Sequence, residues 1–103
     1  MGNELATMVL GVVGDIPPGR VMSYGDVAAA AGYPGAARQV GLIASQGGGD
    51  LPWHRVVRAN GSLAGLEGGS NWQSEALRAE GVEIHDGRID GFHACRWFPD
   101  QVG

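Results

Sequence analysis

The chain has 103 residues, of which 44% are hydrophobic and 17% are charged, and this size predicts one globular domain, residues 1–103. The single cysteine, Cys95, excludes an internal disulfide and a zinc site built from cysteine pairs, so we expect a cytoplasmic protein with neither a metal ion nor a cofactor. No apolar run reaches the roughly 20 residues that cross a bilayer, and the N-terminus lacks the basic region of a signal peptide, which argues against a membrane partner.

Charge is unevenly distributed along the chain. The formal net charge of −4 argues against a nucleic-acid partner, because DNA-binding domains are usually basic. Between residues 16 and 58, however, four arginines stand against two acids, whereas residues 59–103 hold three arginines and seven acids. Any positive surface is therefore expected in the first half. Since the chain contains no lysine, a phosphate contact must come from arginine, a hydroxyl or a backbone N–H.

Two helices are predicted in the first third of the chain. The apolar residues of segment 4–14 recur at helical spacing, namely Leu5, Met8, Val9, Val12 and Val13. The paired prolines of segment 15–20 end this helix. Ser23 and Asp26 then have the spacing of a capping box, the alanine run that follows forms a second helix, and Gly32 ends it.

A third helix is predicted after Pro34 and Gly35. Its inward stripe consists of Ala37, Val40, Ile43 and Ala44, and the glycines at 47–49 end it. Two short helices joined by a few residues that include Gly and Pro are typical of a helix-turn-helix, although helical hairpins without a DNA-binding role are far commoner.

The second half of the chain predicts two β-hairpins on either side of another helix. Asn60-Gly61 and Asp86-Gly87 each lie between short apolar runs and favour a tight hairpin turn. The helix is predicted over 71–80, with Gly81 as its stop, and its inward residues are Trp72, Ala76, Leu77 and Ala79. The expected fold class is therefore mostly α with small β-hairpins, a winged-helix-like DNA-binding domain containing a helix-turn-helix.

The segment LPWHRVV, residues 51–57, is the main candidate for a functional site. A histidine in such a place is more often a hydrogen-bonded core residue than a catalytic one. Here, however, Pro52 fixes the approach to His54, and the valines that follow begin a strand, so the imidazole would lie at a rigid junction, where functional residues gather. Trp53 carries a donor N–H and no usable lone pair, so it cannot act as a nucleophile.

Three motifs in order, YGDVAAAAG, GAARQVG and PWHRVV, resemble the DNA-binding domain of the O6-alkylguanine-DNA alkyltransferases, over about Leu5 to Gly81. In that family the third motif reads PCHRV, and its cysteine accepts the alkyl group. Trp53 stands in place of this cysteine, as in the similar alkyltransferase-like proteins, which bind alkylated guanine without repairing it. Because dealkylation needs a thiolate, the resemblance implies that this chain is not an enzyme.

The resemblance also implies which residues contact DNA. Arg38 matches the arginine that enters the stack from the minor groove and fills the gap left by a flipped base, and Tyr24 matches the tyrosine that helps to rotate the nucleotide outward. Small residues would let the third helix approach a narrow groove, and two polar residues on it are candidate phosphate contacts. The predicted DNA-binding residues are Tyr24, Ala36, Ala37, Arg38, Gln39, Gly41 and Ser45.

A lesion pocket is expected around the tryptophan. Its predicted residues are Trp53, His54, Val56, Leu66 and Tyr24. His54 and Glu80 match the family's base and its orienting carboxylate, and without a nucleophile we expect them to persist as a structural hydrogen-bonded pair. Some relatives place a basic residue after the HRVV motif to stack on the modified base, whereas Leu66 or Glu67 stands near that position here.

Together these expectations describe a monomeric, non-enzymatic sensor of DNA damage. It would bind double-stranded DNA containing O6-alkylguanine, flip the lesion into the pocket, remain nucleoid-associated while bound, and signal to nucleotide-excision-repair proteins. Two other classes stay open. One is a winged-helix transcription factor that reads the major groove, and the other is a residual alkyltransferase or hydrolase that uses Cys95 or the pair His54 and Glu80.

Overall fold

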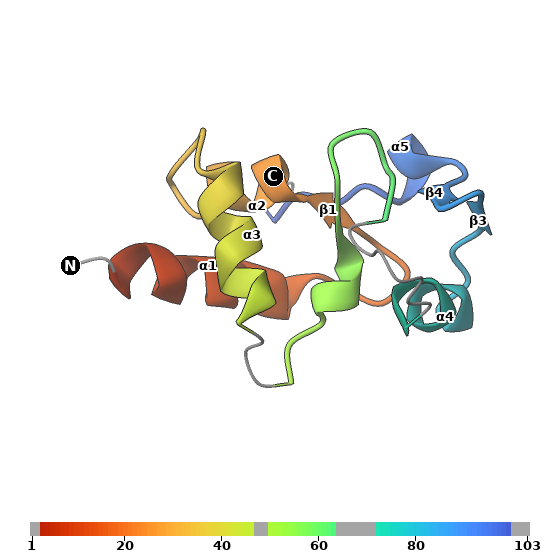
Figure 1. Ribbon diagram of the computed structural model, residues 1–103, viewed down its shortest axis with the longest axis horizontal. Helices are drawn as coiled ribbons and strands as arrows, with labels where there is room; N and C mark the ends of the chain where they lie inside the picture. Colours follow the sequence, from red (N-terminus) through yellow and green to blue (C-terminus); the bar gives the residue numbers. More distant parts are fainter. Residues whose placement is uncertain (1–2, 47–49, 64–71, 100–103) are drawn as a thin grey trace.

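Helices dominate the regular structure of the computed structural model, which describes residues 3–46, 50–63 and 72–99 (Figure 1). The helices are α1 (Asn3–Asp15), α2 (Tyr24–Ala30), α3 (Ala37–Ser45), α4 (Trp72–Ala79) and α5 (Phe92–Cys95), with a 3₁₀ turn, η1 (Trp53–Arg55). The strands β1 (Met22–Ser23) and β2 (Val56–Val57) form one small sheet, and β3 (Ile84–His85) and β4 (Arg88–Ile89) form another. The predicted fold class is confirmed. None of the described helices is long and apolar enough to span a membrane.

Helix α1 buries a narrower face than its sequence predicts. Val9 and Val13 are fully buried, and Ile16, just past the helix, continues the same stripe. Met8 was expected on this face but is 46% exposed. The buried residues are spaced at i, i+4 and i+7, so Met8 lies about one residue off the centre of the buried stripe.

Helices α2 and α3 pack against each other and against α1, as Figure 1 shows. The predicted capping box starts α2: the Ser23 hydroxyl accepts a hydrogen bond from the Asp26 N–H at 3.0 Å, and the Asp26 carboxylate accepts one from the Ser23 N–H at 3.1 Å. Gly32 follows the end of α2 and has a φ of 94°. Val40 of α3 is fully buried in the core that α1, α2 and α3 share. The helix-turn-helix is confirmed.

The strand β2 pairs in parallel with β1, with Met22 opposite Val56 and Ser23 opposite Val57. All four residues are buried, and the backbone of Val21 pairs in turn with that of Arg96 from the C-terminal segment. Met22, Val56 and Val57 are apolar, as expected of buried strand residues, and the polar Ser23 is the one that caps α2. The small parallel sheet therefore ties the start of α2 to the end of η1.

The predicted hairpin at Asn60-Gly61 is only partly right. A tight turn forms there, because the Gly61 N–H donates to the Arg58 carbonyl at 2.8 Å and the Arg58 N–H donates to the Ser62 carbonyl at 3.0 Å. The chain after the turn then leaves β2 and pairs with β4, through a bridge between Ser62 and Arg88. The turn thus joins two different sheets and does not close an antiparallel ladder on β2.

The predicted hairpin at Asp86-Gly87 is confirmed. Strands β3 and β4 pair antiparallel, with Ile84 opposite Ile89 and both side chains buried. Asp86 and Gly87 both have positive φ, 55° and 74°, as a two-residue type I′ turn requires.

The inward face of α4 differs from the prediction. Leu77 is fully buried as expected, but Trp72 is 54% exposed and Ala79 is also exposed. Gln73, which the sequence did not single out, is buried, and its amide donates to the carbonyls of His54 and Val56 at 3.1 and 3.0 Å. An apolar residue could not donate to these two carbonyls, which explains why a glutamine is buried on this face of α4.

Gly61 and Gly11 should respond oppositely to the same substitution to alanine. Gly61 has a φ of 85°, and a Cβ there would lie 3.1 Å from the Phe92 ring, so Gly61→Ala is expected to lower the free energy of unfolding by about 1–3 kcal/mol. Gly11 lies within α1 with nothing within 4 Å of such a Cβ, so Gly11→Ala should raise it by about 0.5–1 kcal/mol. Urea unfolding of both variants measures the difference, and a stable Gly61→Ala protein would contradict the close packing.

Candidate nucleic-acid interface

Trp53 opens η1, between Leu51-Pro52 and the buried strand β2. The turn is held by its own backbone, since the Arg55 N–H donates to the Pro52 carbonyl at 2.9 Å. The indole is partly buried and packs against the core formed mainly by α1, α2 and α3. Its Nε1 is buried and has no hydrogen-bond partner among the described residues. Because Nε1 is the only polar atom of this side chain, whatever part of the indole remains accessible is carbon.

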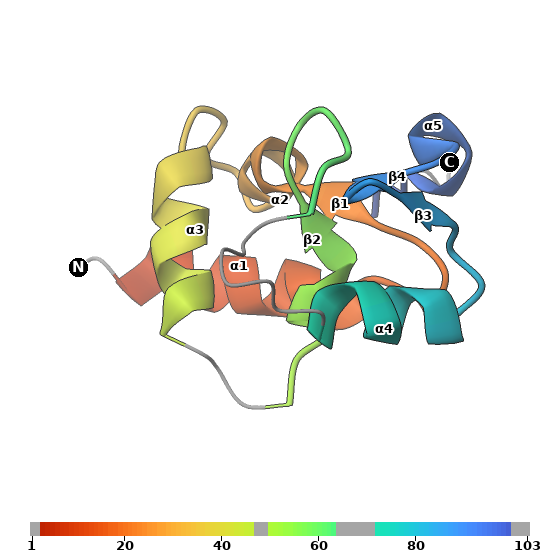
Figure 2. The same ribbon diagram turned by 45° about the vertical axis from the view of Figure 1, so that its right-hand side comes forward.

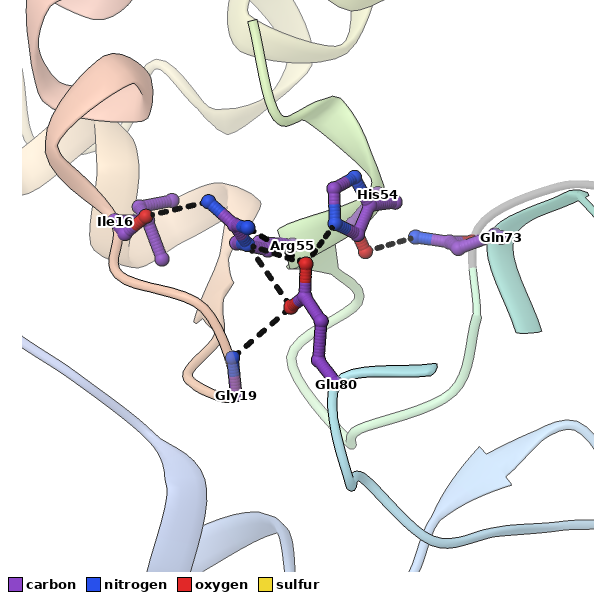
Figure 3. A network of polar contacts seen from close by, with 6 residues as sticks. All are labelled: Ile16, Gly19, His54, Arg55, Gln73 and Glu80. Carbon is purple, nitrogen blue, oxygen red and sulfur yellow. Dashed lines mark hydrogen bonds and ion pairs between the residues drawn. The ribbon is translucent and has the colours of Figure 1, made fainter. Parts of the chain in front are cut away.

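His54, the next residue, is directed toward Glu80 (Figure 3). Its Nε2 lies 2.8 Å from Glu80 Oε2, and its backbone carbonyl accepts the hydrogen bond from Gln73. The two side chains predicted to pair are therefore in contact. Their side chains are 17% and 16% exposed, so the pair lies close to the surface without being open to it.

Arg55 makes the strongest contacts in this network. Its Nε and Nη2 donate to the Glu80 carboxylate at 3.0 and 2.6 Å, and its Nη1 donates to the Ile16 carbonyl at 2.8 Å. The Gly19 N–H donates to the same carboxylate at 2.9 Å. These donors outweigh burial and lower the pKa of Glu80 from 4.5 to about 2, with the Arg55 hydrogen bonds as the largest stabilising cause.

Only two of the four arginines of residues 16–58 are available to form the positive surface expected in the first half of the chain. Arg55 is committed to Glu80, and Arg20 donates to the carbonyls of Cys95 and Arg96 at 3.1 and 2.9 Å. Both side chains therefore connect segments that are distant in the sequence. Arg38 and Arg58 are exposed, so they are the arginines of this stretch that can meet a ligand.

Tyr24 is the first residue of α2, directly after the capping serine. It is partly buried and packs against the same core as Trp53, so the structure brings these two predicted residues onto one core. Burial raises the pKa of the Tyr24 phenol, and the positive charge of Arg58 acts against this rise. The phenol therefore remains a neutral hydrogen-bond donor at physiological pH.

Helix α3 presents a thin outer face. Arg38 and Gln39 are exposed in its first turn, and a Cβ added at Gly41 would have nothing within 4 Å. Ala36 and Ala37 are half-buried beside them. The Ser45 hydroxyl already donates to the Leu42 carbonyl at 2.8 Å, which leaves its oxygen as an acceptor and weakens it as a phosphate donor.

Two residues of the predicted pocket cannot be placed as expected. The Val56 side chain is fully buried in β2, so only its backbone is close to the site, and its carbonyl already accepts from Gln73. Leu66 lies outside the described residues. The predicted pocket is therefore represented in the structure by Trp53, His54 and Tyr24.

Cys95 is poorly suited to accept an alkyl group. It lies at the end of α5 and packs against the second core, which Leu77, Val82 and Ile84 help to form, whereas Trp53 packs against the first. Its thiol donates to the Phe92 carbonyl at 3.7 Å, and burial raises its pKa. A thiol with a raised pKa forms less of the thiolate that alkyl transfer needs.

One group in the described part of the chain brings possible metal ligands together. The ligand atoms of Glu83, His85 and Asp90 all lie within 4.8 Å of one another, on the outer face of the β3–β4 hairpin. All three side chains are exposed, and exposed groups of this kind are common without an ion.

Sequence reasoning missed the two residues that complete the Glu80 network, Arg55 and Gln73. A signal for Gln73 exists, since Gln73, Leu77 and Glu80 are spaced at i, i+4 and i+7 and therefore share one face of α4. Arg55 carries no such signal, because its partners Ile16 and Glu80 lie 39 and 25 residues away.

The substitution Glu80→Gln tests the network. It leaves the half-buried Arg55 guanidinium without its counter-charge, so we expect the free energy of unfolding at neutral pH to fall by about 2–3 kcal/mol. Glu75→Gln, an exposed change in the same helix, should alter it by less than about 0.5 kcal/mol.

The acid dependence of stability should change in the same variant. Because the Glu80 pKa is lowered from 4.5 to about 2, its contribution is fully present above pH 4.5 and is lost as the pH falls toward 2. Urea unfolding between these limits should show a steeper loss of stability in the unsubstituted protein than in Glu80→Gln. Equal slopes would contradict the role assigned to Arg55.

The chain is similar to known DNA-binding proteins in both sequence and fold. Residues 4–82 match the model of the 6-O-methylguanine DNA methyltransferase DNA-binding domain. The chain is 45% identical to the DNA base-flipping protein of Escherichia coli (strain K12) over 89 residues, covering 84% of this chain and 68% of that protein. It is 47% identical to the methylated-DNA–protein-cysteine methyltransferase of Salmonella typhimurium over 70 residues, covering 64% of this chain and 40% of that enzyme.

The fold matches a solved DNA complex. The structure of Atl1 from S. pombe, bound to damaged DNA containing O6-carboxymethylguanine, superposes with a TM-score of 0.85 at 33% identity and covers 96% of this chain and 99% of that one. The chain thus belongs to the family defined by the 6-O-methylguanine DNA methyltransferase DNA-binding domain, as a member with tryptophan ahead of the site histidine.

Proposed function

We propose that this protein is a non-enzymatic sensor that binds O6-alkylguanine in duplex DNA and flips the modified base out of the stack. The observation that carries the proposal is Trp53, which stands beside an intact His54–Glu80 pair and offers an accessible surface of carbon only. Relatives named as a DNA base-flipping protein, and Atl1 bound to damaged DNA, support the same role.

The absence of catalysis follows from the chemistry of the site. Removing the alkyl group requires a nucleophile that forms a bond to carbon, and an indole offers none. The Glu80 carboxylate is already shared by Arg55, His54 and the Gly19 N–H, so the pair is a structural anchor. Cys95, packed in the second core, does not supply the missing nucleophile.

DNA would be contacted through α3 in the minor groove. Extruding a base costs a few kcal/mol, and less where pairing is already damaged. O6-alkylation removes the N1 proton of guanine and weakens its pairing, so the lesion is easier to extrude than an intact base. Arg38, exposed in the first turn of a thin helix, would enter the gap, while Tyr24 would crowd the backbone and turn the nucleotide outward.

The rival reading as a transcription factor is weaker. A major-groove reader needs polar side chains along its recognition helix. On α3 the exposed polar side chains Arg38 and Gln39 are confined to the first turn, while further along Leu42 is apolar and the Ser45 hydroxyl is occupied within the helix. Such a surface suits contact with shape and backbone more than readout of base edges.

A sensor that does not repair must signal. We propose that the complex, formed by a monomer, is recognised by nucleotide-excision-repair proteins. The exposed acids of the second half of the chain, among them Glu75, Glu83, Asp86 and Asp90, would form the face turned away from DNA.

Binding to matched duplexes that contain guanine or O6-methylguanine at one position tests this function. We expect tighter binding to the lesion, measured by fluorescence anisotropy.

Arg38→Ala should weaken lesion binding by about tenfold or more, equivalent to about 1.4 kcal/mol, because the gap in the stack is no longer filled. Tyr24→Ala should weaken it to a similar degree, and Tyr24→Phe keeps the core packing and serves as the control for folding. Equal affinity for both duplexes would refute the proposal.

The range of adducts tests the pocket. An apolar wall at Trp53 makes no contact that is specific to a methyl group, so we expect similar affinities for O6-methylguanine and for guanine carrying a larger O6 substituent. The same anisotropy assay gives the comparison. A sharp preference for methyl would count against a wide pocket.

A further inference from the structure

We infer that Arg58 is a second cationic contact to the DNA backbone, placed to hold a phosphate next to the nucleotide that Tyr24 displaces. The inference rests on the proposed function and adds a residue to it. The geometry that carries it is the parallel pairing of β1 with β2, which brings the chain just after each strand to the same end of the sheet.

The strand register sets Arg58 beside Tyr24. Ser23 lies opposite Val57, so the next residue on each strand, Tyr24 and Arg58, leaves the sheet at neighbouring positions. Figure 2 shows the turn after β2 standing next to α2. The Arg58 charge is also close enough to act on the phenol, whose pKa it lowers against the effect of burial. An arginine thus accompanies the proposed flipping residue although 34 positions separate them in the chain.

The turn that carries Arg58 is rigid. Its backbone N–H and carbonyl are both used, by Ser62 and by Gly61. The Asn60 side chain accepts hydrogen bonds from the Ser62 N–H and hydroxyl at 3.0 and 2.7 Å, and Gly61 lies so close to the Phe92 ring that a Cβ would have to displace it. A guanidinium on a fixed base loses less conformational freedom when it binds.

Most other arginines are already paired. Arg20, Arg55, Arg78 and Arg96 each donate to a carbonyl or carboxylate within the fold. Arg58 is exposed, and within residues 3–46, 50–63 and 72–99 no hydrogen bond or ion pair of its side chain is found. The chain has no lysine and a net charge of −4, so few of its side chains can neutralise a phosphate. An unpaired arginine next to the proposed flipping residue is one of them.

A phosphate contact makes a specific prediction for salt dependence. Each neutralised phosphate adds about 0.9 to the slope of log affinity against log salt concentration on B-DNA. Arg58→Ala should therefore lower the slope by about 0.9, so that its affinity deficit shrinks by about 3.5-fold between roughly 50 and 200 mM salt. Because phosphates are common to both duplexes, the deficit should be equal on guanine and O6-methylguanine DNA, and the preference for the lesion should be unchanged.

Anisotropy titrations with fluorescein-labelled duplexes of both kinds, over this range of salt, measure the slopes. Arg78→Ala is the matched control, since Arg78 is also exposed but lies on α4, on the other side of β2 from this turn (Figure 2), and its loss changes the net charge equally. Arg58→Lys should keep the slope, since it keeps the charge. Unchanged thermal unfolding midpoints establish that the variants are folded.

The outcomes separate this inference from the proposed function. An unchanged slope in Arg58→Ala, an equal decrease in Arg78→Ala, or a deficit confined to lesion DNA would overturn the phosphate contact while leaving lesion binding intact. Loss of preference for O6-methylguanine in the unsubstituted protein would refute the proposed function, whatever the slope of the Arg58 variant.

Discussion

The Glu80 carboxylate is the point at which three distant segments of this chain are joined. It receives hydrogen bonds from Gly19 after α1 and from His54 and Arg55 in η1, and Glu80 itself directly follows α4. Taking an ion pair out of water is costly, and only a carboxylate with several donors recovers that cost. Because η1 is fixed in this way, Trp53 is held against the core and β2 enters its pairing with β1 in one register. That register in turn places Tyr24 and Arg58. The position of these proposed DNA contacts therefore depends on a hydrogen-bond network that contains neither of them.

Features set by neighbouring residues could be predicted from the sequence. The capping box at Ser23 and Asp26, the stop at Gly32 and the turn at Asp86-Gly87 each depend on a few consecutive side chains and on positive φ angles that glycine and aspartate tolerate. The helix-turn-helix follows from two such local signals in series. The position of His54 next to Glu80 could be anticipated only from the family resemblance, since nothing in the spacing of 26 residues predicts contact.

Features set by distant partners could not be predicted. The Asn60-Gly61 turn was identified, but the residue after it, Ser62, pairs with Arg88 of β4, which is distant in the sequence. Arg20 and Arg55 look like surface charges in the sequence, and their internal roles depend on acceptors 75 and 25 residues away. The helical pattern of apolar residues assigned Trp72 to the inward face, yet Gln73 faces inward, since two carbonyls near η1 need a donor. Hydrophobicity alone does not reveal such a need.

Under the proposed function, a site with an indole ahead of the His54–Glu80 pair would retain a damaged base without altering it. The most direct test follows the alkyl group itself. A duplex with a radiolabelled methyl group on guanine O6 is held in saturated complex with the protein, and protein and DNA are then separated under denaturing conditions. The account predicts that all label stays on guanine. Label on the protein or release of methanol would mean that the site performs chemistry and would contradict the account.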